Sequence, residues 1–170
     1  MQRKGKGTNR EMPVVLAAIV VLVAGDFGST FFYHVPLHLW FTLHLRTHHD
    51  RRRPYWDHAV LSRDPHVLLD GALGAIPYLI VAWYVWPLSP IGALTGLVLG
   101  QAHVWWRHTS ELGWESPAWV KLLARALWVV LPEDHARHHR NPAQEFGDIF
   151  RFYDAPARAL LAGMKRIHSS

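Results

Sequence analysis

The chain of 170 residues contains no cysteine. This absence excludes disulfides, thiolate metal sites, iron–sulfur clusters and a cysteine nucleophile, and it favours neither a reducing nor an oxidising compartment. Residues 71–106 contain no acidic residue, lysine or arginine. The motifs HExxH and HxxEH are also absent. The sequence therefore lacks the motif glutamate that serves as general base in the usual zinc hydrolases.

Histidine and tryptophan are abundant instead, with 13 and 9 copies. The formal charge of +5 would suit nucleic acid, but the basic residues flank long apolar runs. We therefore expect a membrane surface as the partner, and no nucleic acid. The length predicts a single domain over residues 13–170, preceded by a basic tail of residues 1–12.

Two apolar stretches predict an all-α integral membrane helical bundle. Residues 13–32 carry one charge, Asp26, and are long enough to cross a bilayer. They lack a small-residue cleavage site, so we expect no cleavable signal peptide. Residues 71–106 would be about 54 Å long as one helix, nearly twice the hydrocarbon core. Pro87 and Pro90 lie at the middle, which predicts two short spans joined by a tight turn.

Smaller patterns indicate how these helices pack and what flanks them. Gly92, Gly96 and Gly100 recur every four residues, and we expect them to allow close helix contact within the chain. Residues 118–131 combine basic residues on one face with leucines on the remainder, which favours an interfacial amphipathic helix over a span. Residues 155–164 are a candidate for a second one.

The distribution of basic residues predicts the orientation. The hairpin returns the chain to the side that it left, so residues 33–70 and 107–170 share one side. That side holds 14 of the 18 lysines and arginines, and the positive-inside rule places it in the cytoplasm. The tail is basic too, so the side of the N-terminus is left open.

Histidines cluster in two distant segments. Residues 34–49 hold five, which on one continuous helix would share an arc of about 140°. Pro36 can break that helix, but the i, i+4 pairs His34/His38 and His44/His48 survive separately. Residues 135–139 (HARHH) place three more on one helical face. His103 and His108 are the weakest pair, because a spacing of five separates them around a helix.

The clusters predict a metal site. Neutral imidazole is a common ligand of Zn, Cu, Fe and Ni. Eight to ten histidines exceed what a four-coordinate zinc requires, but they suit two metals held by several helices. His58, His66 and His168 lack partners at helical spacing, and we interpret them as ordinary surface or hydrogen-bonded residues.

Three segments resemble the fatty acid hydroxylase / sterol desaturase superfamily: YHVPLHLWFTLHLRTHHD at 33–50, HTSELGW at 108–114, and DHARHHRNPAQEFGDIFRFYDAP at 134–156. The resemblance covers about residues 22–160. It implies a di-iron centre on the cytosolic face of a helical membrane bundle and O2-dependent hydroxylation or desaturation. The implied ligands are His34, His38, His44, His48, His49, His108, His135, His138 and His139, with His103 as a tenth candidate.

The sequence departs from the family pattern in two ways. Many relatives carry a His-Pro-x-Glu element after the second box, where this chain has Asp64, Pro65, His66 and Val67. The chain is also short, and we expect it to lack spans that many relatives have before the first box. The substrate cavity is therefore in question, and a homo-oligomeric partner is one way to complete it.

Asp26 is a candidate second-shell residue, because it lies eight residues before His34 on roughly the same face. It can orient a ligand histidine by accepting its second N–H, or it can make a helix-packing hydrogen bond. Both interpretations stay open. Five further carboxylates could orient ligand histidines in the same way, although solvated loop residues are the simpler interpretation: Glu111, Glu115, Glu133, Asp134 and Asp148.

The expected function is oxidation of a C–H bond in a lipid, sterol or carotenoid-like substrate, with two Fe ions, O2 and an external electron donor. Because 170 residues leave no room for a redox domain, we expect a separate reductase, ferredoxin or cytochrome-type donor. The alternatives are a zinc-dependent membrane hydrolase and a metal-binding or transport membrane protein. The ligand motifs name neither the substrate nor the choice between hydroxylation and desaturation.

Overall fold

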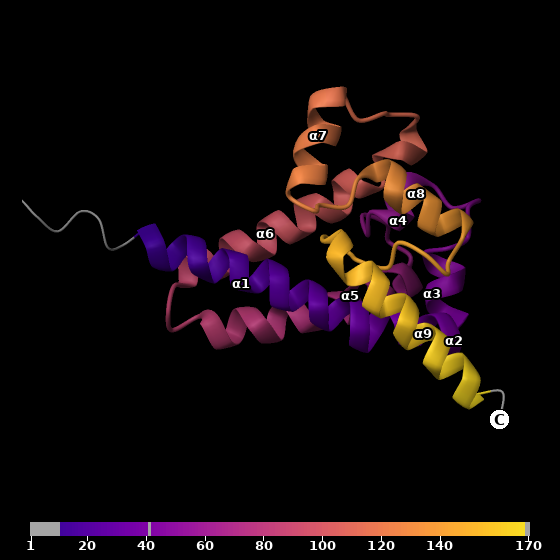
Figure 1. Cartoon of the computed structure of the whole chain (residues 1–170), viewed down its shortest axis with the longest axis horizontal. Helices are drawn as coiled ribbons and strands as arrows, with labels where there is room; N and C mark the ends of the chain where they lie inside the picture. Colours follow the sequence, from indigo (N-terminus) through magenta and orange to yellow (C-terminus); the bar gives the residue numbers. More distant parts are fainter. Residues whose placement is uncertain (1–10, 41, 169–170) are drawn as a thin grey trace, which may run out of the picture.

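The computed structural model describes residues 11–40 and 42–168. Three long helices lie side by side, α1 (Glu11–Ser29), α5 (Pro65–Val85) and α6 (Pro90–Arg107) (Figure 1). One isolated bridge, Val129 with Phe150, is the only β pairing among the described residues, which confirms the all-α class. The shorter elements gather mainly at one end: η1 (Thr30–His34), α2 (Val35–Trp40), α3 (Thr42–Thr47), α4 (Tyr55–His58), η2 (Thr109–Leu112), α7 (Ala118–Ala126), α8 (Pro132–Arg140), η3 (Arg151–Tyr153) and α9 (Asp154–His168).

Helix α1 continues through a π-helical segment, η1, into α2. The Val35 N–H bonds to the Thr30 carbonyl five residues back. Pro36 has no N–H, and its ring would crowd the turn before it, which is the turn that η1 widens. The helix therefore does not break at Pro36. His34 and His38 lie on one continuous stretch, and π segments are frequent at functional sites.

Helices α5 and α6 form the predicted hairpin, although of the two only α5 is long and apolar enough to cross a membrane. The Ser89 side chain accepts the Gly92 N–H at 3.0 Å, and Pro90 is the first residue of α6. Helix α6 packs closely on α1 at two glycines. A Cβ added to Gly92 would lie only 2.4 Å from the Val14 carbonyl oxygen, and one added to Gly96 would lie 2.7 Å from Val21 Cβ. Close contact within the chain is thus confirmed for these two glycines. An added Cβ at Gly100 would meet nothing nearer than 3.8 Å.

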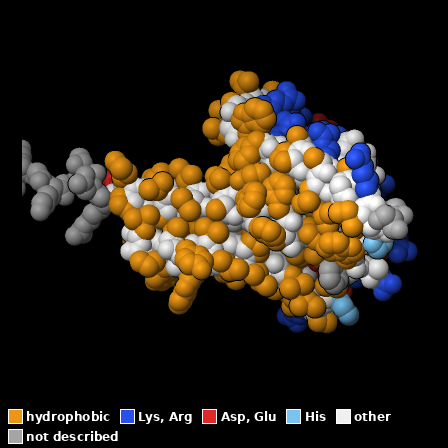
Figure 2. All heavy atoms as spheres, turned by 60° about the horizontal axis from the view of Figure 1, so that its bottom comes forward, with side chains coloured by type: hydrophobic (Ala, Val, Ile, Leu, Met, Phe, Trp, Pro, Cys, Tyr) orange, Lys and Arg blue, Asp and Glu red, His pale blue; other side chains and the backbone are white. Residues whose placement is uncertain are grey.

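The surface of the three-helix end is apolar. Among the described residues, two helical stretches are long and apolar enough to cross a membrane, Glu11–Trp40 and α5. Large side chains on α5 are exposed, with Trp83 at 77% and Tyr84 at 78%. Figure 2 shows hydrophobic side chains over this end and lysine and arginine side chains gathered at the other. Such extensive apolar exposure is typical of surfaces that contact a membrane or another protein. The basic tail of residues 1–10 lies outside the described part of the chain.

Two amphipathic helices flank the histidine-rich end. Helix α7 exposes Trp119 and Leu122, as an interfacial helix would. It ends at Ala126 rather than at 131, because Trp128 adopts a positive φ of 57° that stops the helix. Val130 is consequently buried. Helix α9 is longer than expected and buries Leu161 in a small core with Val35, Phe146 and Ala157.

Candidate metal centre

Four histidines form a first group, which we call group one: His34, His38, His49 and His138. One ring nitrogen of each lies within 4.8 Å of the others. They come from η1, α2, the turn after α3, and α8. No two of them are sequence neighbours, so tertiary folding assembles the group.

A second group, group two, consists of His48, His108, His135 and His139, again with nitrogens within 4.8 Å of one another and all four residues buried. The neighbours His48 and His49 belong to different groups, and so do His138 and His139. Consecutive residues point in different directions from the backbone. The two HH pairs therefore hold the groups next to each other, with the rings of His48 and His49 5.5 Å apart.

Backbone carbonyls orient three of these rings. The Nδ1–H of His34 donates to the Phe146 carbonyl (2.9 Å). The Nδ1–H of His138 donates to the Gln144 carbonyl (2.5 Å), and that of His108 donates to the Val104 carbonyl (2.7 Å). A donating Nδ1 fixes the tautomer and leaves the Nε2 lone pair free. The free lone pairs point into the two groups.

Within each group, two Nε2 atoms lie unusually close together. Two such lone pairs repel each other unless a proton or a metal ion lies between them. His34 and His138 approach to 2.9 Å and His108 and His135 to 2.9 Å. A metal about 2.0–2.1 Å from each of two cis nitrogens separates them by about 3 Å. Further nitrogens, among them Nε2 of His38 and both of His49, are buried without a partner. The side chains present therefore fit two metal ions, one in each group.

Electrostatics keep the imidazoles neutral. Burial, reinforced by nearby positive groups, lowers the pKa of His48, His108, His135 and His138 well below the ordinary value of 6.5. The same causes lower the pKa of His139 to about 2. Neutral imidazole is the form that binds metal, so these residues present lone pairs at neutral pH.

His44 lies between the two groups, stacked on His48 with ring centroids 4.8 Å apart. Its Nδ1 lies 3.1 Å from Asp70 Oδ2, and its Nε2 is buried without a partner. Asp70 itself accepts hydrogen bonds from the Tyr33 and Thr47 hydroxyls at 2.5 and 2.8 Å. This carboxylate–histidine pair, which the sequence analysis missed, aims His44 Nε2 at the centre.

His58 lies beside group two, although its spacing predicted an ordinary role. Its Nδ1 bonds to Glu111, its Nε2 is buried without a partner, and its ring is 5.1 Å from that of His139. His58, Glu111 and His139 form a third set with metal-ligand geometry. The Glu111 partner is 53 residues away, so no helical spacing could have revealed it.

His103 lies apart from both groups. Its Nε2–H donates to the Val130 carbonyl at 3.0 Å, and its ring packs on Trp106. It belongs to none of the metal-ligand sets found among the described residues. Nine of the ten histidines predicted as ligands thus lie at the centre, together with His58, which was not among the ten. His66 and His168 are exposed, as expected.

A model of the fatty acid hydroxylase family matches residues 18–157, which is most of the chain. The chain belongs to this family. No curated protein and no solved structure matches it. Family membership makes the chain an oxidoreductase of the hydroxylase type with a histidine-rich metal site, in agreement with the two groups.

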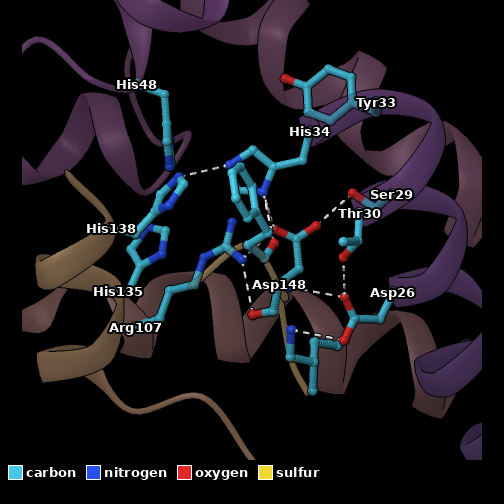
Figure 3. A network of polar contacts seen from close by, with 12 residues as sticks. Asp26, Ser29, Thr30, Tyr33, His34, His48, Arg107, His135, His138 and Asp148 are labelled. Atoms are coloured by element: carbon cyan, nitrogen blue, oxygen red, sulfur yellow. Dashed lines mark hydrogen bonds and ion pairs between the residues drawn. The ribbon is translucent and has the colours of Figure 1, made fainter. Parts of the chain in front are cut away.

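Within this hydroxylase fold, Asp26 does not contact a histidine. Its carboxylate accepts the backbone N–H groups of Asp148, Ile149 and Phe150 at 2.9, 3.0 and 2.6 Å, and the Thr30 hydroxyl at 3.0 Å. Figure 3 shows this carboxylate below the histidines. This role is closer to the packing interpretation than to the orientation of a ligand, because the carboxylate holds the loop after α8 onto α1.

Asp148 connects that loop to the metal centre. Its carboxylate accepts Arg107 Nη1 at 2.7 Å and the Ser29 hydroxyl at 2.5 Å, and it lies 3.7 Å from His34 Nδ1. Phe146, two residues earlier, supplies the carbonyl that orients His34. The network in Figure 3 therefore fixes His34 from a loop more than a hundred residues away.

A cavity of about 310 Å³ borders the centre on the side of α5 and α6. His34, His44, His48 and His58 line its inner end. Its volume lies in the range of about 300–1,000 Å³ that is usual for small-molecule sites. The cavity gives a substrate access to both groups.

We expect His58→Ala to weaken metal binding at group two by about ten- to a hundredfold, because it removes a buried nitrogen aimed at the site. His103→Ala is the matched control and is expected to leave metal affinity within about twofold, since only a hydrogen bond to a carbonyl is lost. Competition with a coloured chelator measures both. Equal losses in the two variants would contradict the placement of His58.

We expect Asp70→Asn to lower activity about ten- to a hundredfold while metal content stays unchanged, because His44 loses the carboxylate that orients it. Asp57→Asn is a suitable control, since Asp57 also borders the cavity but pairs with Arg53 rather than with a histidine. Turnover and metal content would be measured on the same preparations. Full activity of Asp70→Asn would show that His44 needs no such support.

Proposed function

We propose that the chain holds two iron ions, one in each group, and oxidises a C–H bond of a lipid-like substrate with O2. The observation that carries this proposal is the pair of adjacent all-histidine groups at the end of an apolar cavity. Nitrogen donors alone suit several metals, and membership of the fatty acid hydroxylase family supports iron. Bound iron would supply the activation of O2 and the oxidising power.

The residues of the chain have three tasks in this reaction. The histidines of both groups bind the ions, with His44 and His58 as a fifth ligand for each. Asp70 and Glu111 orient those two rings. The apolar cavity holds the substrate and limits access of water, which protects a reactive centre from side reactions.

We further propose that α1, α5 and α6 span the membrane and that the basic, histidine-rich end faces the cytoplasm, following the excess of lysine and arginine there. Electrons then come from a separate reductase, ferredoxin or cytochrome-type protein on that side. The substrate is a lipid, sterol or carotenoid-like molecule that reaches the cavity from the bilayer.

The test is a single-turnover reaction. Purified protein would be analysed for metal, reduced without O2, mixed with membrane lipid extract, and exposed to isotopically labelled O2. We expect two irons per chain and a hydroxylated product that carries the label; a new double bond without label would identify a desaturase. Zinc in place of iron, with a hydrolysed product that forms without O2, would instead identify the hydrolase alternative.

A further inference from the structure

The cavity at the metal centre opens sideways between α5 and α6. Leu79 on α5 is 53% exposed, Gln101 on α6 is also exposed, and both line the cavity. A residue that lines a cavity and is exposed marks its mouth. This mouth lies between two helices whose outer faces are apolar, so it faces the hydrocarbon of a surrounding bilayer.

Gly100 keeps part of the passage from the mouth to the histidines open, whereas Gly71 and Gly74 allow close contact with Val60 and Tyr33, 2.4 and 3.1 Å from an added Cβ. Gly71, Gly74 and Gly100 all line the cavity. An added Cβ at Gly100 would meet only ordinary contacts, 3.8 Å from Leu22 and 3.9 Å from Tyr78. Because α6 does not pack tightly here, space remains for a ligand.

Gln101 is chemically unusual at the mouth. It is the only amide in residues 71–106, a stretch without acidic residues, lysine or arginine. Among the described residues, none forms a hydrogen bond with its side chain. An unpartnered amide facing hydrocarbon is costly, so a donor and an acceptor are available to a ligand.

A second apolar space does not offer the same access. A groove of about 670 Å³ lies between α1 and α5, lined by Phe27, Leu73, Ile76 and Ile80 among others. Tyr33 lines both the groove and the cavity. Its hydroxyl lies 2.5 Å from the Asp70 carboxylate, to which it donates, and 2.8 Å from the Asp70 carbonyl, so its ring is held as a wall between the two spaces.

We propose that the substrate enters from the bilayer through the mouth between α5 and α6, and that Gln101 hydrogen-bonds an oxygen function near one end of it. This inference rests on the proposed function and specifies the substrate class: an apolar lipid with a hydroxyl, carbonyl or carboxyl group at one end. The apolar remainder lies along the cavity towards the histidines. Gln101 is a specificity-determining residue that favours such lipids over plain hydrocarbons.

The placement also predicts where the substrate is oxidised. Gln101 and His108 are seven residues apart, about 10 Å along a helix, and His108 belongs to group two. A carbon at the metal centre is therefore several bonds from the oxygen bound by Gln101. Oxidation beside the oxygen function is not expected.

Neighbouring positions on α5 supply a matched pair of variants. Leu79 lines the cavity and Ile80 lines the groove, and their exposed fractions are 53% and 52%. The iron-loaded protein in lipid nanodiscs would be photolabelled with a long-chain fatty alcohol that carries a diazirine at its methyl end. We expect Leu79→Trp to abolish labelling of Val104 inside the cavity and Ile80→Trp to leave it unchanged. The reverse pattern, or loss in neither variant, would overturn the proposed entrance.

Gln101→Met keeps the length of the side chain and removes the amide. We expect the fatty alcohol to label the cavity with about five- to tenfold lower affinity, as the loss of one hydrogen bond predicts, while the hydrocarbon that carries the same diazirine binds equally to both proteins. Equal losses for the two probes would refute recognition by Gln101. Both readouts are independent of turnover, so labelling without oxidation would sink the proposed function and leave the binding site standing.

Discussion

Replacing His138 by alanine is expected to remove the metal from group one and to lower activity at least about a hundredfold. The residue is buried, its Nδ1 is held by the Gln144 carbonyl, and its Nε2 lies 2.9 Å from that of His34. Its loss therefore removes a preoriented ligand and leaves the His34 lone pair without a shared ion. Metal analysis should fall from two ions to one per chain.

His135→Ala makes the reciprocal test, because it removes a ligand from group two and should retain the ion of group one. His66→Ala is the control, since His66 is exposed and bonds only to Asp64. It should retain both ions and full activity. Two ions retained in His138→Ala, or loss of both ions in all three variants, the His66→Ala control included, would contradict two separate four-histidine groups.

The largest effect on stability is expected for Asp26→Ala. Asp26 is fully buried and accepts three backbone N–H groups and one hydroxyl. Removing the carboxylate leaves these donors without partners in a dry site, which should lower the free energy of unfolding by at least about 3 kcal/mol and the melting temperature by roughly 5 to 10 °C. Thermal unfolding in detergent, followed by tryptophan fluorescence, measures the change.

Asp50→Ala is the matched control for this variant. Asp50 pairs only with the exposed Arg52 in a surface loop, and such pairs contribute about 1 kcal/mol or less. Asp26→Ala should also loosen His34, because the loop that it holds carries the Phe146 carbonyl. An unchanged melting temperature for Asp26→Ala would show that the loop is held by other contacts.

Local patterns predicted much of the helical framework. The uncharged run of residues 71–106, interrupted by prolines, predicted the α5–α6 hairpin, and glycines every four residues predicted close contact of α6 with a neighbour. Both signals depend on backbone chemistry within a few residues. The end of α7 was predicted too late, because a positive φ at Trp128 and burial of Val130 depend on contacts with the loop near Phe150.

The sequence predicted which kind of residue forms the metal centre, but it did not predict how these residues are grouped in space. The number of clustered histidines indicated two metals, and the structure places one member of each HH pair in each group. His58, His103 and Asp70 could not be assigned from spacing, because each is defined by a partner distant in sequence. Asp26 likewise binds a loop more than a hundred residues away.

The sequence by itself determined that this is a helical, histidine-rich, membrane-type chain of the hydroxylase family, since periodicity, hydropathy and ligand type are properties of neighbouring residues. Only the tertiary structure decided which histidines lie together, which carboxylates orient them and where the cavity opens. The physical reason is that a metal site requires nitrogen atoms within a few ångströms of one point. That distance is set by how η1, α2, the turn after α3, α6 and α8 pack together, and no single segment contains it.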